Sequence, residues 1–265
     1  MKVFISADIE GVTGCTVWDE TEKGKDLYDS FVKQMTFEVK AACDGINEAG
    51  LAEITVKDAH DSGRNIDHNL LPKNTKLIRG WDGGLYSMVQ GLDESYDCLM
   101  FIGYHSAASR NTNPLSHTMN TVLDYIKING KIASEFTIHS YIAASLGVPV
   151  VMLTGDKGLC DDALDLNDNI NTVAVKEGIG NSTLNIHPSL ALDLIKRAAK
   201  NAVEQDMLKC LIELPHDFNL EIKYRNHKDA YRASYYPGVE KLDSNRIIYR
   251  SKDYMEVLRM MSFTL

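Results

Sequence analysis

Short apolar runs alternate with amphipathic stretches over the first two-thirds of the chain, which is the pattern of βαβ units on a parallel sheet. Apolar residues recur at three- and four-residue steps from Tyr28 to Ile46 and predict a helix that ends near Gly50. Further helices are predicted over Glu135–Leu146 and Leu190–Val203. Apolar runs predict buried strands at Val3–Ala7, Cys98–Gly103 and Val148–Leu153, and short strands are predicted at Ile54–Val56 and Lys76–Ile78.

The pattern changes after about Glu204, where the segments become shorter and more polar. The segments in question are Asn219–Lys223, Val239–Leu242 and Arg246–Ser251, with a turn at Pro237-Gly238 and a closing helix at Tyr254–Met261. We therefore predict an α/β fold, with a mostly parallel Rossmann-like sheet and helices on both of its faces. The expected division is a metal-binding α/β domain at 1–205 and a smaller α+β domain at 206–265.

Composition narrows the class of protein. The 265 residues carry a formal net charge of −9, which argues against a nucleic-acid partner because phosphate binding needs clustered Lys and Arg. The longest apolar stretches fall far short of the ~18 residues that span a membrane, and Asp8 interrupts any signal-peptide core. Five scattered cysteines without a CxxC pair predict reduced thiols in a cytoplasmic protein.

Carboxylate and imidazole side chains follow the predicted strands at the point where each strand ends. Asp8 and Glu10 come just after the first strand, two residues apart, so that both can face one point. His60 and His105 follow two other strands, and Glu135 follows the short region 126–132. Open α/β sheets bind ligands at this edge, and these oxygen and nitrogen donors suit Zn²⁺ or Mn²⁺. With Asp8 as a bridge, Glu10 and His60 can complete one site, and His105 and Glu135 a second.

Each of these residues also has an ordinary structural interpretation. Asp8 and Glu10 fit a turn and a helix cap, and Glu135 fits the first turn of a helix. His60 fits a loop histidine, and His105 a hydrogen-bonded core histidine. Spacing alone therefore predicts a metal site at the sheet edge without identifying a reaction.

A sixth residue, His117, follows His105 in an irregular loop. A histidine held near the metals without ligating them can serve as a general base, a general acid or an oxyanion stabiliser. An exposed loop histidine is the alternative. Other catalytic patterns are missing, because the chain has no GxGxxG, GxxxxGK[ST] or GxSxG motif.

Several segments together resemble the zinc-dependent D-aminopeptidase family, in order along nearly the whole chain. The matching segments are SADIEGVTG (6–14), VKDAH (56–60), YSMVQGL (86–92), FIGYH (101–105), LSHTM (115–119), VPVVMLTGD (148–156) and the turn PGVE (237–240).

The resemblance implies two Zn²⁺ per subunit, with Mn²⁺ or Co²⁺ as substitutes. Asp8, Glu10 and His60 match the ligands of one ion, and Asp8, His105 and Glu135 those of the other. His117 matches the family's catalytic histidine. The family's activity is removal of an N-terminal D-residue from short peptides or amides by metal-activated water, in a decameric ring. We therefore expect a small peptide substrate, a homo-oligomer, and neither a nucleic-acid nor a membrane partner.

The sequence departs from the family pattern near the expected site. The segment between His105 and His117 is one residue longer than in the typical member, and Ser134 replaces the usual glycine before Glu135. His139 stands where the family typically has asparagine, and on a helix it shares a face with Glu135. These changes spare the expected ligands but bear on the preference for D-alanine.

Two other functions fit the same donors. One is a metal hydrolase of a different small amide, an L-peptide or a phosphate ester. The other is a non-catalytic metal-binding module. A substrate panel separates the first from an aminopeptidase, and metal analysis separates the second.

Overall fold

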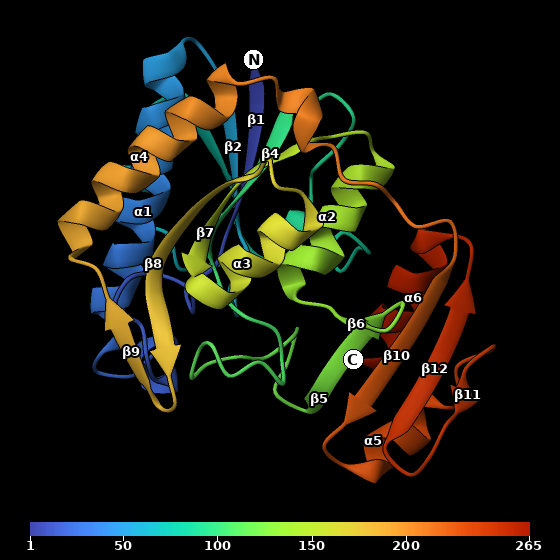
Figure 1. Cartoon of the computed structure of the whole chain (residues 1–265). Coiled ribbons are helices and arrows are strands. Elements are labelled where there is room, and N and C mark those ends of the chain that lie inside the picture. The colour runs from blue at the N-terminus through green and yellow to red at the C-terminus, as the bar shows by residue number, and fades with distance from the viewer.

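A seven-stranded sheet forms the centre of the computed structural model, which describes residues 1–265 (Figure 1). Its strand order is β3-β2-β1-β4-β7-β8-β9, and all neighbours are parallel except β8 and β9. The strands are β1 (Lys2–Ala7), β2 (Glu53–Asp58), β3 (Thr75–Ile78), β4 (Cys98–Tyr104), β7 (Val150–Asp156), β8 (Asn171–Ile179) and β9 (Ser182–Asn185). The predicted mostly parallel sheet is confirmed.

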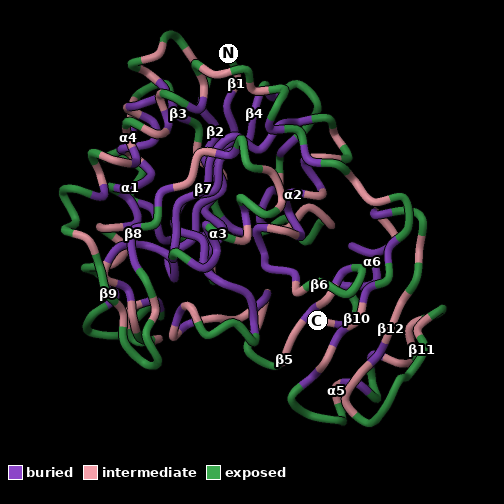
Figure 2. Tube along the Cα trace, viewed as in Figure 1, coloured by how far each residue is buried: buried purple, intermediate pink, exposed green.

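Helices cover both faces of this sheet because alternate residues of the central strands point in opposite directions. Val3 and Ile5 pack with residues of α1 (Tyr28–Ala49) and α4 (Pro188–Glu204). Phe4, between them, belongs to the cluster that contains residues of α2 (Glu135–Ser145) and α3 (Lys157–Leu166). Both faces of β1 and β4 are therefore buried, as the purple centre of Figure 2 shows.

A second, antiparallel sheet lies at the lower right of Figure 1, in the order β11-β12-β10-β5-β6. Its strands are β5 (Leu123–Ile128), β6 (Lys131–Ile132), β10 (Phe218–Tyr224), β11 (Glu240–Lys241) and β12 (Arg246–Ser251), and its helices are α5 (His227–Ala233) and α6 (Tyr254–Thr264). Two of its strands, β5 and β6, come from the middle of the chain. The predicted domain boundary between residues 205 and 206 stays a prediction. A domain defined by the antiparallel sheet would also include residues 123–132.

The two sheets share part of their core. Residues of β5, β10 and α6 belong to the same hydrophobic cluster as those of α2 and β4. The Tyr254 hydroxyl donates a hydrogen bond to the carbonyl oxygen of Ile138 in α2, at 2.7 Å. Short 3-10 helices complete the chain: η1 (Trp18–Glu20), η2 (His68–Leu70), η3 (Ser87–Val89) and η4 (Met207–Cys210). None of the helices combines the length and the apolar character needed to cross a membrane.

Candidate active site

The strand order reverses between β1 and β4, because the chain runs from β1 to β2 and β3 on one side and from β4 to β7 and β8 on the other. Ligands of open α/β sheets bind at the carboxyl ends of the strands beside such a reversal. Asp8 directly follows β1, His105 directly follows β4, and His60 lies two residues after β2. The structure therefore brings these three side chains to one place.

Two glycines allow the segments after β1 and β4 to cross in close contact. The Gly11 N–H donates to the Gly103 carbonyl oxygen at 2.8 Å, and a Cβ on Gly11 would lie 1.8 Å from the carbonyl oxygen of Tyr104. Gly103 has a φ of +72°, and a Cβ there would lie 2.3 Å from the Asp8 carbonyl oxygen. Only glycine fits at such approaches. This crossing brings the Asp8 carboxylate to within 3.5 Å of His105.

The first group of donors consists of Asp8, Glu10 and His60. His60 Nδ1 lies 3.3 Å from Asp8 Oδ1 and 3.1 Å from Glu10 Oε2. On its other side, Nε2 lies 2.9 Å from the carbonyl oxygen of Thr21. Because a carbonyl only accepts, Nε2 carries a proton, which fixes the ring orientation as it does for many metal-binding histidines. Nδ1 therefore faces two carboxylates.

The second group consists of Asp8, His105 and Glu135. His105 Nε2 lies 3.5 Å from Asp8 Oδ2 and 3.3 Å from Glu135 Oε2, while Nδ1 donates to the Ser106 carbonyl oxygen at 3.0 Å. Glu135 begins α2, whose N-cap Ser134 accepts a hydrogen bond from the backbone of the first turn. The helix N-terminus thus delivers the carboxylate to the sheet edge.

The facing atoms of both groups fit a divalent cation. Glu10 Oε2 and His105 Nε2 are buried and have no hydrogen-bond partner, although both lie in the middle of the cluster. Leaving such atoms unpaired costs free energy unless something binds them. The ligand atoms that all lie within 4.8 Å of one another are those of Asp8, Glu10 and His105 and those of His105, His117 and Glu135, so these two sets cut across the two groups and centre on His105. Carboxylate oxygens and imidazole nitrogens at these distances are typical donors for zinc.

Charge interactions within the cluster are strong because its members are buried. Burial disfavours a charged His105, but the carboxylates of Glu135 and Asp8 outweigh it and raise the pKa of His105 to about 10. Burial and the charge of Glu10 raise the pKa of Asp8 well above its usual range. Burial would also raise the pKa of Glu135, but His105 outweighs it and lowers that pKa to about 2. The carboxylates therefore strongly favour positive charge at the centre of the cluster.

His117 lies against the second group in a different way. Its ring stacks on that of His105, with centroids 4.2 Å apart and planes 11° apart, and Trp18 contacts it edge-on. His117 Nε2 lies 3.6 Å from Glu135 Oε1, and Nδ1 donates to the Leu115 carbonyl oxygen at 2.9 Å. Burial and the nearby His105 lower the pKa of His117. The ring is thus held by its Nδ1 side and leaves Nε2 at the cavity.

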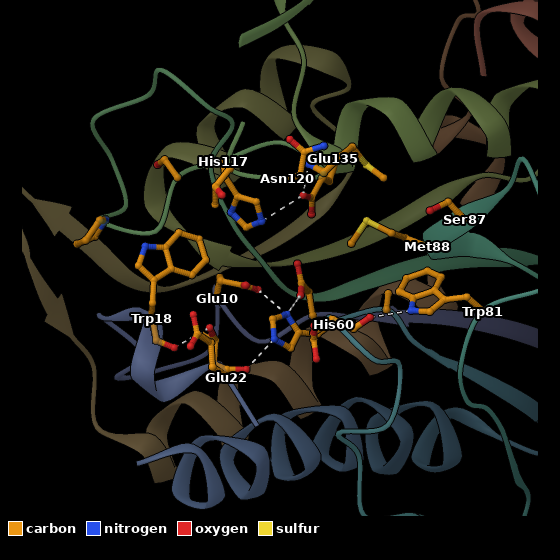
Figure 3. A pocket seen from close by; sticks show the side chains of 18 of the residues that line it. Glu10, Trp18, Glu22, His60, Trp81, Ser87, Met88, His117, Asn120 and Glu135 are labelled. Carbon is orange, nitrogen blue, oxygen red and sulfur yellow. Dashed lines mark hydrogen bonds and ion pairs between the residues drawn. The ribbon is translucent and has the colours of Figure 1, made fainter. Parts of the chain in front are cut away.

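Asp8, Glu10, His60, His117 and Glu135 line a cavity of about 830 Å³, within the range of ~300–1,000 Å³ typical of ligand sites, and His105 is buried behind them. Figure 3 shows His60 and Glu10 facing one another, with His117 and Glu135 grouped above them. Further lining residues come from η1, η3, the loop before β5 and the residue after β10. The cavity therefore combines the edge of the parallel sheet with a wall from the antiparallel sheet.

Comparison with known proteins places this arrangement in a family. The family model of the M55 peptidases, described as D-aminopeptidase, matches residues 1–263. The chain belongs to the M55 D-aminopeptidase family. It is therefore a peptide-bond hydrolase, as the resemblance implied.

Two relatives of this M55 peptidase illustrate the match. The D-aminopeptidase of Bacillus subtilis (strain 168) is 30% identical over 264 residues, which cover 98% of this chain and 95% of the relative. A solved structure, the Zn-dependent D-aminopeptidase DppA from Bacillus subtilis, described as a self-compartmentalizing protease, has a TM-score of 0.91. It is 29% identical, and the match covers 98% of this chain and 95% of that one.

The M55 peptidase has two supporting residues near the donors whose contacts the sequence did not specify. Lys176 in β8 is buried, and its Nζ donates to the backbone carbonyl oxygens of Glu10 and Cys15, which holds the loop after β1. His139, buried in α2, donates through Nδ1 to the Glu135 carbonyl oxygen at 2.6 Å and accepts through Nε2 from the Met88 N–H at 3.4 Å. A buried lysine was not expected, because Lys in an alternating strand usually faces solvent.

Proposed function

We propose that this chain is a binuclear zinc aminopeptidase that removes N-terminal D-residues from short peptides or amides. The observation that carries the proposal is the cluster of buried imidazole nitrogens and carboxylate oxygens that face one another without hydrogen bonds between them. Membership of the D-aminopeptidase family and the similarity to a Zn-dependent relative support both the metal and the reaction.

In this proposal Asp8, Glu10 and His60 hold one zinc ion, and Asp8, His105 and Glu135 hold the other. The two oxygens of Asp8 face different histidines, Oδ1 toward His60 and Oδ2 toward His105, which suits a bridging role. When bound, zinc supplies a polarised scissile carbonyl and a water whose pKa is near neutrality. The backbone carbonyls behind the histidines keep each ring oriented toward the centre.

In this proposal His117 transfers a proton through its Nε2 atom. Because Nδ1–H donates to the Leu115 carbonyl oxygen, Nε2 is the atom that faces the cavity, and in the neutral ring it accepts a proton from the attacking water. The protonated ring can then donate to the developing oxyanion or give this proton to the leaving amine. Glu135 Oε1 also accepts from the Met119 N–H at 2.6 Å, which fixes the carboxylate beside the ring. Carboxylates of the cavity wall attract the free ammonium group of the substrate.

Metal removal tests the proposal. Dialysis against a chelator should abolish hydrolysis of D-alanyl p-nitroanilide and of D-alanyl dipeptides, and zinc should restore both activities. Metal analysis should find two ions per chain, and an L-alanyl substrate panel should show slower turnover. Full activity in metal-free protein, or a single ion per chain in fully active enzyme, would contradict the proposal.

Assembly and location belong to the same proposal. The relative DppA is described as self-compartmentalizing, and together with the family resemblance this supports a homodecameric ring. All five cysteines are free and buried, which is typical of a reducing compartment and supports a cytoplasmic location. Multi-angle light scattering should give the mass of ten chains, and a monomeric mass for active enzyme would contradict the ring.

A further inference from the structure

The cavity wall has a marked imbalance of charge. Five carboxylate side chains line it, against one side chain that is permanently cationic, that of Arg225. The carboxylates are those of Asp8, Glu10, Glu22, Asp61 and Glu135. Two zinc ions would neutralise part of this negative charge near the histidines, but Glu22 and Asp61 would keep theirs. An anionic group that enters the cavity therefore has one side chain of fixed positive charge to bind.

Arg225 is held in place without an anionic partner. It follows β10 directly, its N–H donates to the Val122 carbonyl oxygen at 2.9 Å, and its Nε donates to the Leu123 carbonyl oxygen at 3.2 Å. Its two terminal guanidinium nitrogens make no hydrogen bond or ion pair within the chain. Anchoring through Nε restricts the side chain, so less conformational entropy is lost when the other nitrogens bind.

Other arginines of the same sheet behave differently. Arg246 pairs with Asp243 at 2.6 Å, and Arg250 pairs with Glu240 at 2.8 Å. Both guanidinium groups thus have carboxylate partners within the chain, and neither arginine lines the cavity. Arg225 instead lines the cavity that contains the metal donors. The contrast indicates that its partner comes from outside the chain.

We propose that Arg225 binds the C-terminal carboxylate of a short peptide substrate and makes this chain selective for peptides with a free carboxyl end. The inference rests on the proposed aminopeptidase function. Guanidinium binds carboxylate through paired, charge-assisted hydrogen bonds. A zwitterionic peptide would then bind in one direction, with its ammonium group among the carboxylates and its carboxylate at Arg225. Neutral amides and p-nitroanilides lack the group that Arg225 binds.

The test compares matched pairs of substrates in the zinc-loaded enzyme. D-Ala-Gly and D-Ala-Gly-Gly are each assayed as the free acid and as the C-terminal amide, with wild type and Arg225→Gln. In Arg225→Gln, we expect kcat/KM for at least one free acid to fall by about 10- to 100-fold, which is the usual effect of losing a hydrogen bond to a charged group. The kcat/KM for the corresponding amide should change less than about twofold. Arg225→Lys should recover part of the loss.

Arg232→Gln is the matched control, because Arg232 is an exposed arginine of the neighbouring α5 that does not line the cavity. It should leave all four substrates unchanged. Equal losses on acid and amide would show that Arg225 has only a structural role, and no loss on any acid would show that the carboxylate binds elsewhere. Either result overturns the inference.

A binding measurement separates this inference from the proposed function. Calorimetric titration of the zinc-loaded protein with a peptide analogue whose scissile bond is reduced to an amine should show weaker binding of the acid form to Arg225→Gln, and equal binding of the amide form. If wild type binds the acid form better but hydrolyses no D-alanyl peptide, the reaction is wrong while the Arg225 contact stands. Equal affinity of wild type for acid and amide would overturn the contact.

Discussion

The two sheets contribute to the same cavity in different ways. The parallel sheet and α2 contribute buried donors, with Asp8 and Glu10 each 2% exposed, and each histidine ring is held by a backbone carbonyl. The antiparallel sheet contributes Arg225, an exposed side chain held through one nitrogen only. Under the proposed function, this difference assigns the reaction to the buried edge of the parallel sheet and substrate choice to the exposed wall that the antiparallel sheet supplies.

Asp8→Asn should have the largest effect, because it changes the buried donor that lies between the two histidines at the edge of the parallel sheet. The amide lacks the charge that would hold two cations in the proposed site, so we expect loss of both metals and a fall in kcat/KM of more than about 10⁴-fold. Asp124→Asn is the control, because Asp124 lies in the antiparallel sheet and pairs there with Lys223 at 2.6 Å. Retention of two ions per chain in Asp8→Asn, measured by metal analysis, would exclude Asp8 as the bridge.

His117→Ala tests a distinction among the buried residues that lie at the edge of the parallel sheet. It asks whether His117 transfers a proton or binds metal as the proposed ligands do. We expect kcat to fall about 10²- to 10⁴-fold, the usual contribution of a general acid or base, with metal content unchanged. Because donor atoms of His105, His117 and Glu135 lie within 4.8 Å of one another, ligation by His117 is the competing role. Loss of one ion from the variant would establish that role instead.

Gly11→Ala should have the smallest effect on the reaction and tests whether the crossing after β1 and β4 positions the donors. The new methyl group would meet the Tyr104 carbonyl oxygen at 1.8 Å, so we expect a loss of roughly 1–3 kcal/mol in the free energy of unfolding and weaker zinc binding. Gly24 has a φ of +93°, so Gly24→Ala also strains the backbone and should lower the free energy of unfolding, but its methyl group meets no atom within 4 Å and zinc binding should stay the same. Denaturant unfolding and zinc titration measure both effects, and unchanged zinc affinity in Gly11→Ala would refute the positioning role.

The sequence predicted the parts of the fold that local pattern determines. β1, β4 and β7 are buried on both faces, and their continuous apolar runs revealed them. The helix α3 was not predicted, because its ten residues include Gly158 and three aspartates, which have low helix propensity. β8 was missed as well, since Lys176, Glu177 and Gly178 interrupt its short apolar run Val173–Val175.

The same distinction applies to the site. Donors that lie just after strands could be found from the predicted strand ends, because these ends meet at one edge of a parallel sheet. The structure brings Asp8, His60 and His105 together as this prediction required. Lys176 and Arg225 could not be found in this way. Their contacts join segments far apart in the sequence: Lys176 Nζ to Glu10, 166 positions away, and Arg225 Nε to Leu123, 102 positions away. Only the packing of β8 and β10 determines these contacts.

The chain contains two tryptophans, Trp18 and Trp81, and both line the cavity. All indole fluorescence of the protein therefore originates at the walls of this one cavity. Cation loading, substrate entry and product release could each be followed by intrinsic emission in unmodified enzyme, and replacing either indole with phenylalanine would assign a signal to one wall.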